Sequence, residues 1–242
     1  MQIWPAIDLR NGKCVRLRQG DYERETIFAD DPAAVASDFV AQGAECLHLV
    51  DLDGAREGRL VNLASIRAIV EAVDVPCELG GGIRDRETIT TLIDAGVSRL
   101  VVGTQAIKRA DWFRQMCREF PGHMVLGVDA RGGRVATEGW LETSDVAATD
   151  LARSFAEEPL AAIVYTDIAR DGMMQGPNLA AMSEMCAAVE LPVVASGGVA
   201  RREDVAALAE LPLAGCIIGR ALYEGGLSLG DALAAAQGPV ER

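Results

Sequence analysis

Short apolar runs recur along the chain at intervals of about 30 residues. Eight of them lie at 3–7, 46–50, 75–79, 99–103, 124–128, 161–165, 192–196 and 215–219. Continuous apolar runs of this length are typical of strands that a parallel sheet buries on both faces. Helical patterns lie between them, at 31–42, 62–73, 86–96 and 201–211. This alternation of strand and helix predicts an α/β fold.

The number of units favours a closed barrel. Eight strand–helix units in 242 residues match the size of a (β/α)8 TIM barrel. An open, doubly wound sheet of this length would have fewer strands and a GxGxxG fingerprint after its first strand, which is absent here. Because no linker or low-complexity segment interrupts the pattern, we expect a single barrel domain over residues 1–242.

The two halves of the chain resemble each other. The segment "GGIRDRETITTLIDAGVSRLVVGT" (81–104) aligns without a gap with "GGVARREDVAALAELPLAGCIIGR" (197–220). Two shorter pairs follow the same order: "AIDLRNGK" (6–13) with "GVDARGGR" (127–134), and "VDLDGA" (50–55) with "TDIARDG" (166–172). Chance similarity between βα units is the alternative, but a gapless match of this length disfavours it. We therefore expect two duplicated half-barrels.

Glycine-rich turns follow the third and seventh strands, and a further glycine ends the strand after each. In a TIM barrel these turns lie at the catalytic face, where free backbone N–H groups at helix starts bind phosphate. Tight turns without a ligand are the alternative. Their occurrence in both halves instead predicts one substrate with a phosphate at each end. The candidate phosphate-binding residues are Gly81, Gly82, Arg84, Gly103, Thr104, Ser196, Gly197, Gly198, Gly219 and Arg220.

Charge and composition restrict the partners. A formal net charge of −13 argues against nucleic acid or an anionic membrane. No apolar stretch is long enough to span a membrane, and the start, "MQIWPAIDLR", lacks signal-peptide features, so we expect a cytoplasmic protein. Local N–H dipoles and two arginines can still bind a phosphate, because surface charge is screened beyond about 10 Å.

The positions of the cysteines and histidines restrict the redox compartment and the possible chemistry. No two cysteines have CxxC spacing, so we expect buried thiols in a reducing compartment rather than a disulfide or zinc framework. The six are Cys14, Cys46, Cys77, Cys117, Cys186 and Cys216. With His48 and His123 as the only histidines, neither a Ser-His-Asp triad nor a His-rich metal site is expected.

The repeat also pairs two carboxylates. Asp8 ends the first strand and Asp129 the fifth, so the two should face each other across the barrel mouth. Such a pair can act as acid and base on one substrate. Structural aspartates that cap loops are the alternative. Asp51 and Asp167 end the second and sixth strands.

Other chemistries fit less well. Schiff-base catalysis needs a lysine at a strand end, but Lys13 and Lys108, the only lysines, fall in or beyond loops. The aspartates could hold a divalent metal, yet no clustered carboxylate motif is present, and no cofactor motif is evident. Proton transfer on a bis-phosphorylated sugar remains, which suggests isomerisation without a cofactor.

Motifs along essentially the whole chain match one family. They are "PAIDLRNGKCVRLRQGD" (5–21), "HLVDLDGA" (48–55), "ELGGGIR" (78–84), "VVGTQAI" (101–107), "VDARGGRVATEGW" (128–140), "YTDIARDGMMQGPN" (165–178), "ASGGV" (195–199) and "IIGRALYEG" (217–225). In combination they resemble the phosphoribosylformimino-5-aminoimidazole carboxamide ribotide isomerases of histidine biosynthesis (ProFAR isomerases).

The resemblance implies a reaction and roles for residues. Members of this family catalyse a cofactor-free Amadori rearrangement, in which an aminoaldose with two phosphates becomes an aminoketose. By resemblance Asp8 is the general base, Asp129 the general acid, and Thr166 and Asp171 are supporting polar groups. The sequence alone does not decide which aspartate has which role. Gly176 of the "GPN" motif is expected to bind substrate.

Trp140, in the loop after the fifth strand, is expected either to stack on the imidazole of the substrate or to pack on the rim of the barrel. The stretches 18–26 and 131–145 are expected to act as lids that order on binding.

Three alternatives stay open. One is the related cyclase subunit of imidazole glycerol phosphate synthase, which usually begins more like "PCLDV" and lacks the "EGW" motif. Another is a dual-substrate isomerase that also acts on phosphoribosylanthranilate, although "EGWLETS" (138–144) looks like the single-substrate form. The third is a non-catalytic phosphate-binding barrel, which would need no aspartate pair. A monomer is expected, because two halves already close the ring.

Overall fold

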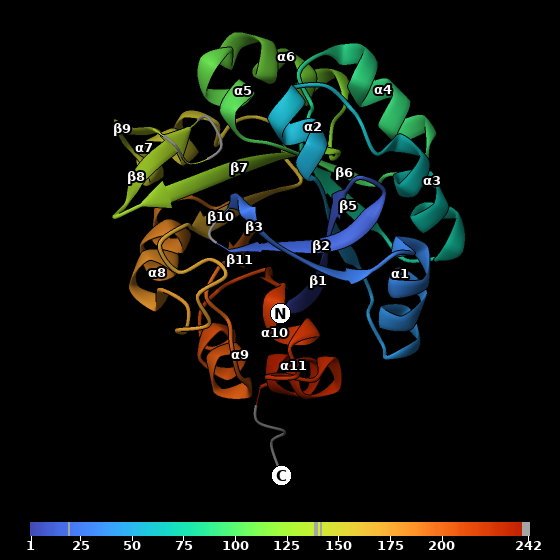
Figure 1. Cartoon of the computed structure of the whole chain (residues 1–242). Helices are drawn as coiled ribbons and strands as arrows, with labels where there is room; N and C mark the ends of the chain where they lie inside the picture. The colour runs from blue at the N-terminus through green and yellow to red at the C-terminus, as the bar shows by residue number, and fades with distance from the viewer. Residues whose placement is uncertain (19, 138–139, 141, 239–242) are drawn as a thin grey trace.

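Eight parallel strands close into a barrel in the computed structural model, which describes residues 1–18, 20–137, 140 and 142–238 (Figure 1). The ring closes because β1 pairs with β12 and β7 with β10. Its strands are β1 (Gln2–Arg10), β4 (Leu47–Asp51), β5 (Cys77–Gly80), β6 (Arg99–Val102), β7 (Met124–Arg131), β10 (Ala162–Asp167), β11 (Val193–Ser196) and β12 (Gly215–Ile218). Each predicted apolar run overlaps one of them, so the TIM barrel is confirmed.

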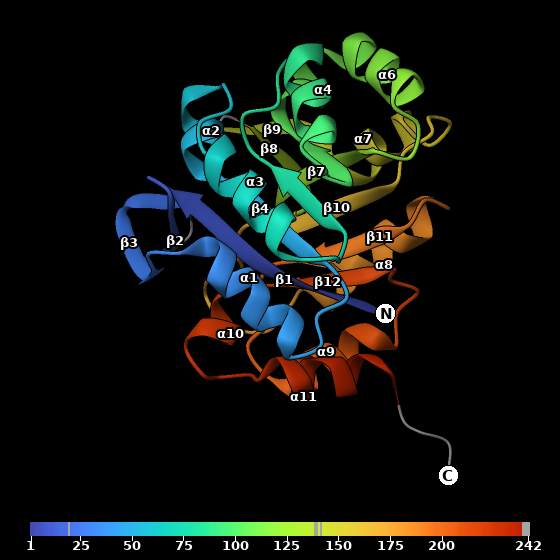
Figure 2. The same ribbon diagram turned by 90° about the vertical axis from the view of Figure 1, so that its right-hand side faces the viewer.

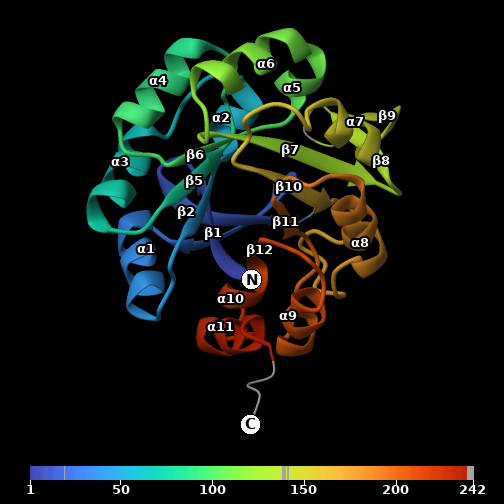
Figure 3. The same cartoon turned by 180° about the vertical axis from the view of Figure 1, so that it is seen from behind.

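Helices surround this barrel on all sides, as the view from behind shows (Figure 3). They are α1 (Pro32–Ala41), α2 (Leu52–Glu57), α3 (Leu63–Ala72), α4 (Arg86–Asp94), α5 (Thr104–Lys108), α6 (Ala110–Glu119), α7 (Ala148–Ser154), α8 (Leu179–Ala188), α9 (Arg202–Ala209), α10 (Arg220–Tyr223) and α11 (Leu229–Ala236). Local signals start several of them. Asp31 caps α1 by accepting the backbone N–H groups of Ala33 and Ala34, and Asp85 caps α4 through Thr88.

A β-hairpin follows the first strand of each half. The first consists of β2 (Lys13–Arg18) and β3 (Asp21–Ala29), and the second of β8 (Arg134–Thr137) and β9 (Glu142–Ala147). Seen from the side, the hairpin β2–β3 lies at one end of the barrel and the N-terminus at the other (Figure 2). The two hairpins occupy the stretches that the sequence marked as lids. The motif residues Glu138 and Gly139, and Leu141 of the second stretch, lie outside the described residues.

Side-chain alternation divides the core into two layers. One apolar cluster fills the barrel interior, and another lies between the strands and the helices. Along β1, Trp4 and Ala6 face inward while Ile3 and Ile7 face the helices. Because every second side chain of a strand points inward, the inward side chains nearest the carboxyl end of each strand lie at the open end of the barrel.

The cysteine expectation needs one correction. Five of the six are buried, but Cys186 is partly exposed, because the buried positions of α8 are those of Met182 and Met185. Burial raises the pKa of the Cys46 and Cys117 thiols to about 12. Among the described residues, no helix is long and apolar enough to cross a membrane.

Candidate active site

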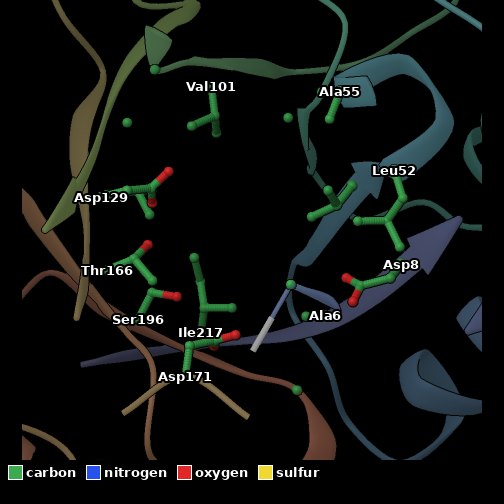
Figure 4. A pocket seen from close by; sticks show the side chains of 18 of the residues that line it. Ala6, Asp8, Leu52, Ala55, Val101, Asp129, Thr166, Asp171, Ser196 and Ile217 are labelled. Atoms are coloured by element: carbon green, nitrogen blue, oxygen red, sulfur yellow. The ribbon is translucent and has the colours of Figure 1, made fainter. Parts of the chain in front are cut away.

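A cavity of about 350 Å³ opens at the carboxyl ends of the barrel strands (Figure 4). This is where the catalytic groups of TIM barrels lie, and the volume falls in the range of small-molecule sites. Every site residue that the sequence predicted lines this cavity, with the exception of Gly176. The aspartates, both pairs of glycine turns and the hairpin tryptophan therefore meet in one place.

Asp8 and Asp129 point into the cavity from opposite sides (Figure 4). Inward positions on β1 run from Trp4 through Ala6 to Asp8. On β7 the inward series runs from Val125 to Asp129 in the same way. The alternation of side chains along the strands thus places both carboxylates in the cavity at the open end of the barrel, as the repeat predicted.

Asp8 is held by an arginine from the first hairpin. The Arg16 guanidinium donates to the Asp8 carboxylate over 2.7 Å and to the Ala6 carbonyl over 2.9 Å. It also lies 5.2 Å from the centre of the Tyr223 ring, whose hydroxyl donates to the same carbonyl over 2.8 Å. This ion pair orients the Asp8 side chain, and an oriented carboxylate is what a general base requires.

Asp129 has a different environment. Burial raises the pKa of its carboxyl, while hydrogen bonds with the Trp140 and Thr166 side chains oppose that rise. Thr166 is the residue that faces Asp129 across the β7–β10 ladder. A carboxyl that holds its proton more tightly than usual suits a general acid.

Trp140 connects the two hairpins above this aspartate. It adopts a left-handed backbone conformation, with φ of 74°. Its ring lies so close to Gly20 that a Cβ atom there would come within 2.9 Å of it. A larger residue at position 20 would therefore collide with the indole.

Asp171, in the turn that follows β10, also lines the cavity (Figure 4). Burial raises its pKa to about 6; Arg16 lowers it, and the charges of Asp8 and Asp129 raise it further. The group is thus a carboxyl that changes protonation state near neutral pH.

We expect Asp171→Asn to stabilise the protein in a pH-dependent way. The pKa of Asp171 in the folded protein lies above its usual value of 3.8, so the contribution of Asp171 to stability is complete below pH 3.8 and is lost as the pH rises through 6. At pH 8 the variant should exceed the wild type by about 2–3 kcal/mol in free energy of unfolding, and at pH 4 by much less. Urea unfolding at the two pH values measures this; a gain of equal size at both would contradict it.

The first pair of glycine turns lies after β5 and β6. Gly81 and Gly82 both have positive φ, 100° and 76°. They run directly against neighbouring backbone, since a Cβ on Gly81 would stand 2.2 Å from the Asp51 carbonyl oxygen. The Arg84 guanidinium packs directly on Gly58. A Cβ atom on Gly58 would lie 2.1 Å from that guanidinium. The glycines of these turns and Arg84 thus line this end of the cavity, and backbone N–H groups together with a guanidinium are the groups that suit a phosphate.

The second pair repeats this geometry after β11 and β12. Gly197 and Gly198 have φ of 97° and 91°, and a Cβ on Gly197 would stand 2.8 Å from the Asp167 carbonyl oxygen. Gly103 and Gly219, which precede α5 and α10, share nearly the same dihedral angles. Here the arginine is Arg220, which donates to the Gly172 carbonyl over 2.8 Å.

Gly176 supports the second pair of turns from outside the cavity. Its N–H donates to the Gly198 carbonyl over 2.9 Å, and its φ is 84°. Gly176 is not among the residues that line the cavity, and its contact is with a loop that does line it. Its role in substrate binding stays a prediction.

Asp51 and Asp167 brace the loops after β4 and β10. Asp51 accepts the N–H groups of Gly54 and Val61 and the side chain of Asn62, which donates over 2.7 Å. In the other half Asn178 donates to Asp167 over the same 2.7 Å. These two carboxylates fix loop shape, which leaves Asp8, Asp129 and Asp171 for chemistry.

Sequence reasoning did not single out three residues that line the cavity. Arg16, Tyr22 and His48 all do so. Tyr22 closes the first hairpin onto α2 by donating to the Leu52 carbonyl over 2.7 Å. Of these three, only His48 had a signal in the sequence, namely its inward position on a strand. Within the described ranges, no three His, Cys, Asp or Glu side chains form a group that could hold a metal ion.

Comparison with known proteins agrees with this site. The model of the family described as "Histidine biosynthesis protein" matches residues 2–228. A protein of Halorhodospira halophila is 54% identical over 98% of this chain and 98% of its own length. One of Rhodopirellula baltica is 53% identical over 96% of this chain and 92% of its own.

Both relatives are named 1-(5-phosphoribosyl)-5-((5-phosphoribosylamino)methylideneamino)imidazole-4-carboxamide isomerase. A protein of Ruegeria pomeroyi with the same name, numbered 1, is 52% identical over its full length. With its barrel, its duplicated glycine turns and this similarity over nearly the whole chain, the protein belongs to the histidine biosynthesis protein family.

Proposed function

We propose that the chain catalyses the Amadori rearrangement of the aminoaldose that its relatives' names specify, to the corresponding aminoketose. It is an intramolecular aldose–ketose isomerase of histidine biosynthesis. The observation that carries this proposal is the opposition of Asp8 and Asp129 between two matched glycine-rich ends of one cavity. A substrate with a phosphate at each end would place its reacting sugar between the two carboxylates.

Ring opening is the first step. Asp129 donates its proton to the ring oxygen, while the lone pair of the amino nitrogen forms the C1=N bond and the C1–O bond breaks. The raised pKa of Asp129 supports this role. Thr166 and Trp140 hold the carboxyl by hydrogen bonds and keep its orientation as the charge on it changes.

Proton abstraction follows on the other side of the cavity. Asp8 removes the proton from C2, the electron pair of that bond forms C1=C2, and the second pair of the C1=N bond returns to the nitrogen. The ion pair with Arg16 supports this role, because the guanidinium holds the Asp8 side chain in place. The enaminol then becomes the aminoketose, as a proton returns to C1 and the C2 hydroxyl loses its own.

An absorbance assay with purified protein tests the proposal directly. We expect turnover of the bis-phosphorylated aminoaldose and none of phosphoribosylanthranilate under the same conditions. Turnover of both would identify a dual-substrate isomerase. Absence of turnover of the aminoaldose by folded protein would overturn the proposed function.

We further propose that the protein acts as a cytoplasmic monomer that does not bind nucleic acid. One chain already contains both glycine-rich ends and both aspartates, so a second copy adds nothing to the cavity. The net charge of −13 supports the absence of polyanionic partners.

A further inference from the structure

A buried ionisable pair lies in the barrel interior, just below the reacting aspartates. His48 of β4 and Glu78 of β5 are direct neighbours across the strand ladder. The Nδ1 atom of His48 lies 2.7 Å from Oε1 of Glu78, and Glu78 is 0% exposed. The second carboxylate oxygen, Oε2, is buried without a hydrogen-bond partner in the described part of the chain. A carboxylate in such a place is costly, so its presence calls for a reason.

The other half of the barrel shows that the fold does not need this pair. By the internal repeat, His48 corresponds to Val164 and Glu78 to Val194. These two valines are also direct neighbours across their ladder, and both belong to the apolar cluster of the barrel interior. The same two positions in the same architecture are thus filled by apolar side chains, which pack without desolvating a charge. Packing alone therefore does not account for the histidine and the glutamate.

His48 faces the cavity. It stands beside Ala6 in the ladder between β1 and β4, one inward step below Asp8, and it lines the cavity together with both aspartates. Burial raises the pKa of Asp129 and of Asp171, and positive charge on His48 works against both rises. The imidazole is thus within electrostatic range of both carboxyl groups.

The contact with Glu78 decides which ring nitrogen is free. A carboxylate accepts, so Nδ1 carries the hydrogen, and in the neutral ring Nε2 is then an acceptor. Within the described residues, no group is hydrogen-bonded to Nε2. The arrangement is that of a base oriented by a buried carboxylate, which also stabilises the imidazolium once a proton arrives.

We propose that His48, oriented by Glu78, is a third catalytic group of the isomerisation, and that it accepts the proton of the C2 hydroxyl as the ketone forms. This inference rests on the proposed function. As the O–H bond of the enaminol breaks, its electron pair forms C2=O. The C1=C2 pair takes up at C1 the proton that Asp8 removed from C2. The imidazolium then returns its proton to Asp129, which had given one to the ring oxygen, so every proton is accounted for.

The paired valines of the other half supply the test variant. The double change His48→Val with Glu78→Val should fold, with a free energy of unfolding equal to or above that of the wild type, because the buried charge is gone. Its kcat should fall at least 10²-fold with KM within about threefold, as for the loss of a general base. Glu78→Gln, which keeps an acceptor for Nδ1 but removes the charge, should lower kcat about tenfold.

A substrate deuterated at C2 separates this role from a structural one. In both variants the slow step moves beyond C2–H cleavage, so the isotope effect on kcat should shrink toward unity. Val194→Ala, an interior change in the other half, serves as the control and should leave kcat and the isotope effect unchanged. If the wild type turns the substrate over and the double variant keeps kcat within threefold, the inference is wrong while the proposed function stands. A lowered kcat with an unchanged isotope effect would also overturn it.

Discussion

Asp129→Asn is expected to lower kcat by at least about 10²-fold while the protein stays folded. The amide still accepts the hydrogen bonds that Trp140 and Thr166 offer, so the loop around it should keep its shape. What the amide lacks is the proton that opens the sugar ring. Steady-state kinetics with the aminoaldose, together with urea unfolding, measure the two effects separately.

Asp8→Asn should cost at least as much activity, with a different signature. The change removes the proposed base for the C2–H bond, so a C2-deuterated substrate should give a larger isotope effect than with the wild type. It also leaves the Arg16 guanidinium without its carboxylate partner, which should lower the free energy of unfolding by about 1–3 kcal/mol.

The control for both aspartates is Asp74→Asn, at an exposed carboxylate before β5 and therefore at the opposite end of the barrel. Activity of Asp8→Asn and Asp129→Asn within tenfold of this control would contradict the two-carboxylate mechanism.

Gly81→Ala is expected to have the largest effect on stability. The new Cβ would lie 2.2 Å from a backbone oxygen of Asp51, at a φ of +100° that side chains rarely adopt. Because that oxygen belongs to the main chain of β4, no rotamer change can relieve the contact. We expect a loss of more than about 3 kcal/mol in free energy of unfolding, or failure to fold.

Gly→Ala changes at two other positions should lower the free energy of unfolding by smaller, graded amounts. Gly197→Ala places its Cβ 2.8 Å from the Asp167 carbonyl oxygen and should cost less than Gly81→Ala. Gly122 has a φ of +78° with nothing within 4 Å, so Gly122→Ala isolates the backbone penalty of about 1–2 kcal/mol. Equal losses at Gly81 and Gly122 would show that close approach is not what these turns require.

The parts of the site that could be predicted from the sequence are those fixed by strand period and by the repeat. Asp8, Asp129 and Thr166 lie at inward positions near the carboxyl ends of their strands, and a period of two is readable without a structure. The glycine turns followed from the alignment of the halves. Both kinds of signal are local in sequence or repeated in it.

Residues whose contacts depend on how distant segments of the chain fold back onto each other could not be predicted in this way. Arg16 reaches Asp8 only because the hairpin β2–β3 folds back over the mouth of the barrel. The contact between His48 and Glu78 depends on the register of two strands that lie far apart along the chain. The hydrogen bond from Gly176 to the Gly198 carbonyl depends in the same way on two loops that are distant along the chain.

Arg84 and Arg220, at the two proposed phosphate ends, have a consequence for the direction in which a ligand binds. In the alignment of the halves Arg84 corresponds to Ala200, and Arg220 to Thr104, so these two arginines come from different loops of their halves. A cavity with true twofold symmetry would accept an elongated bis-phosphate head-first or tail-first with equal affinity. The unequal placement of the guanidinium groups removes that degeneracy. A ligand that entered the wrong way round would meet mismatched ends, and it would occupy the cavity as an inhibitor instead of reacting.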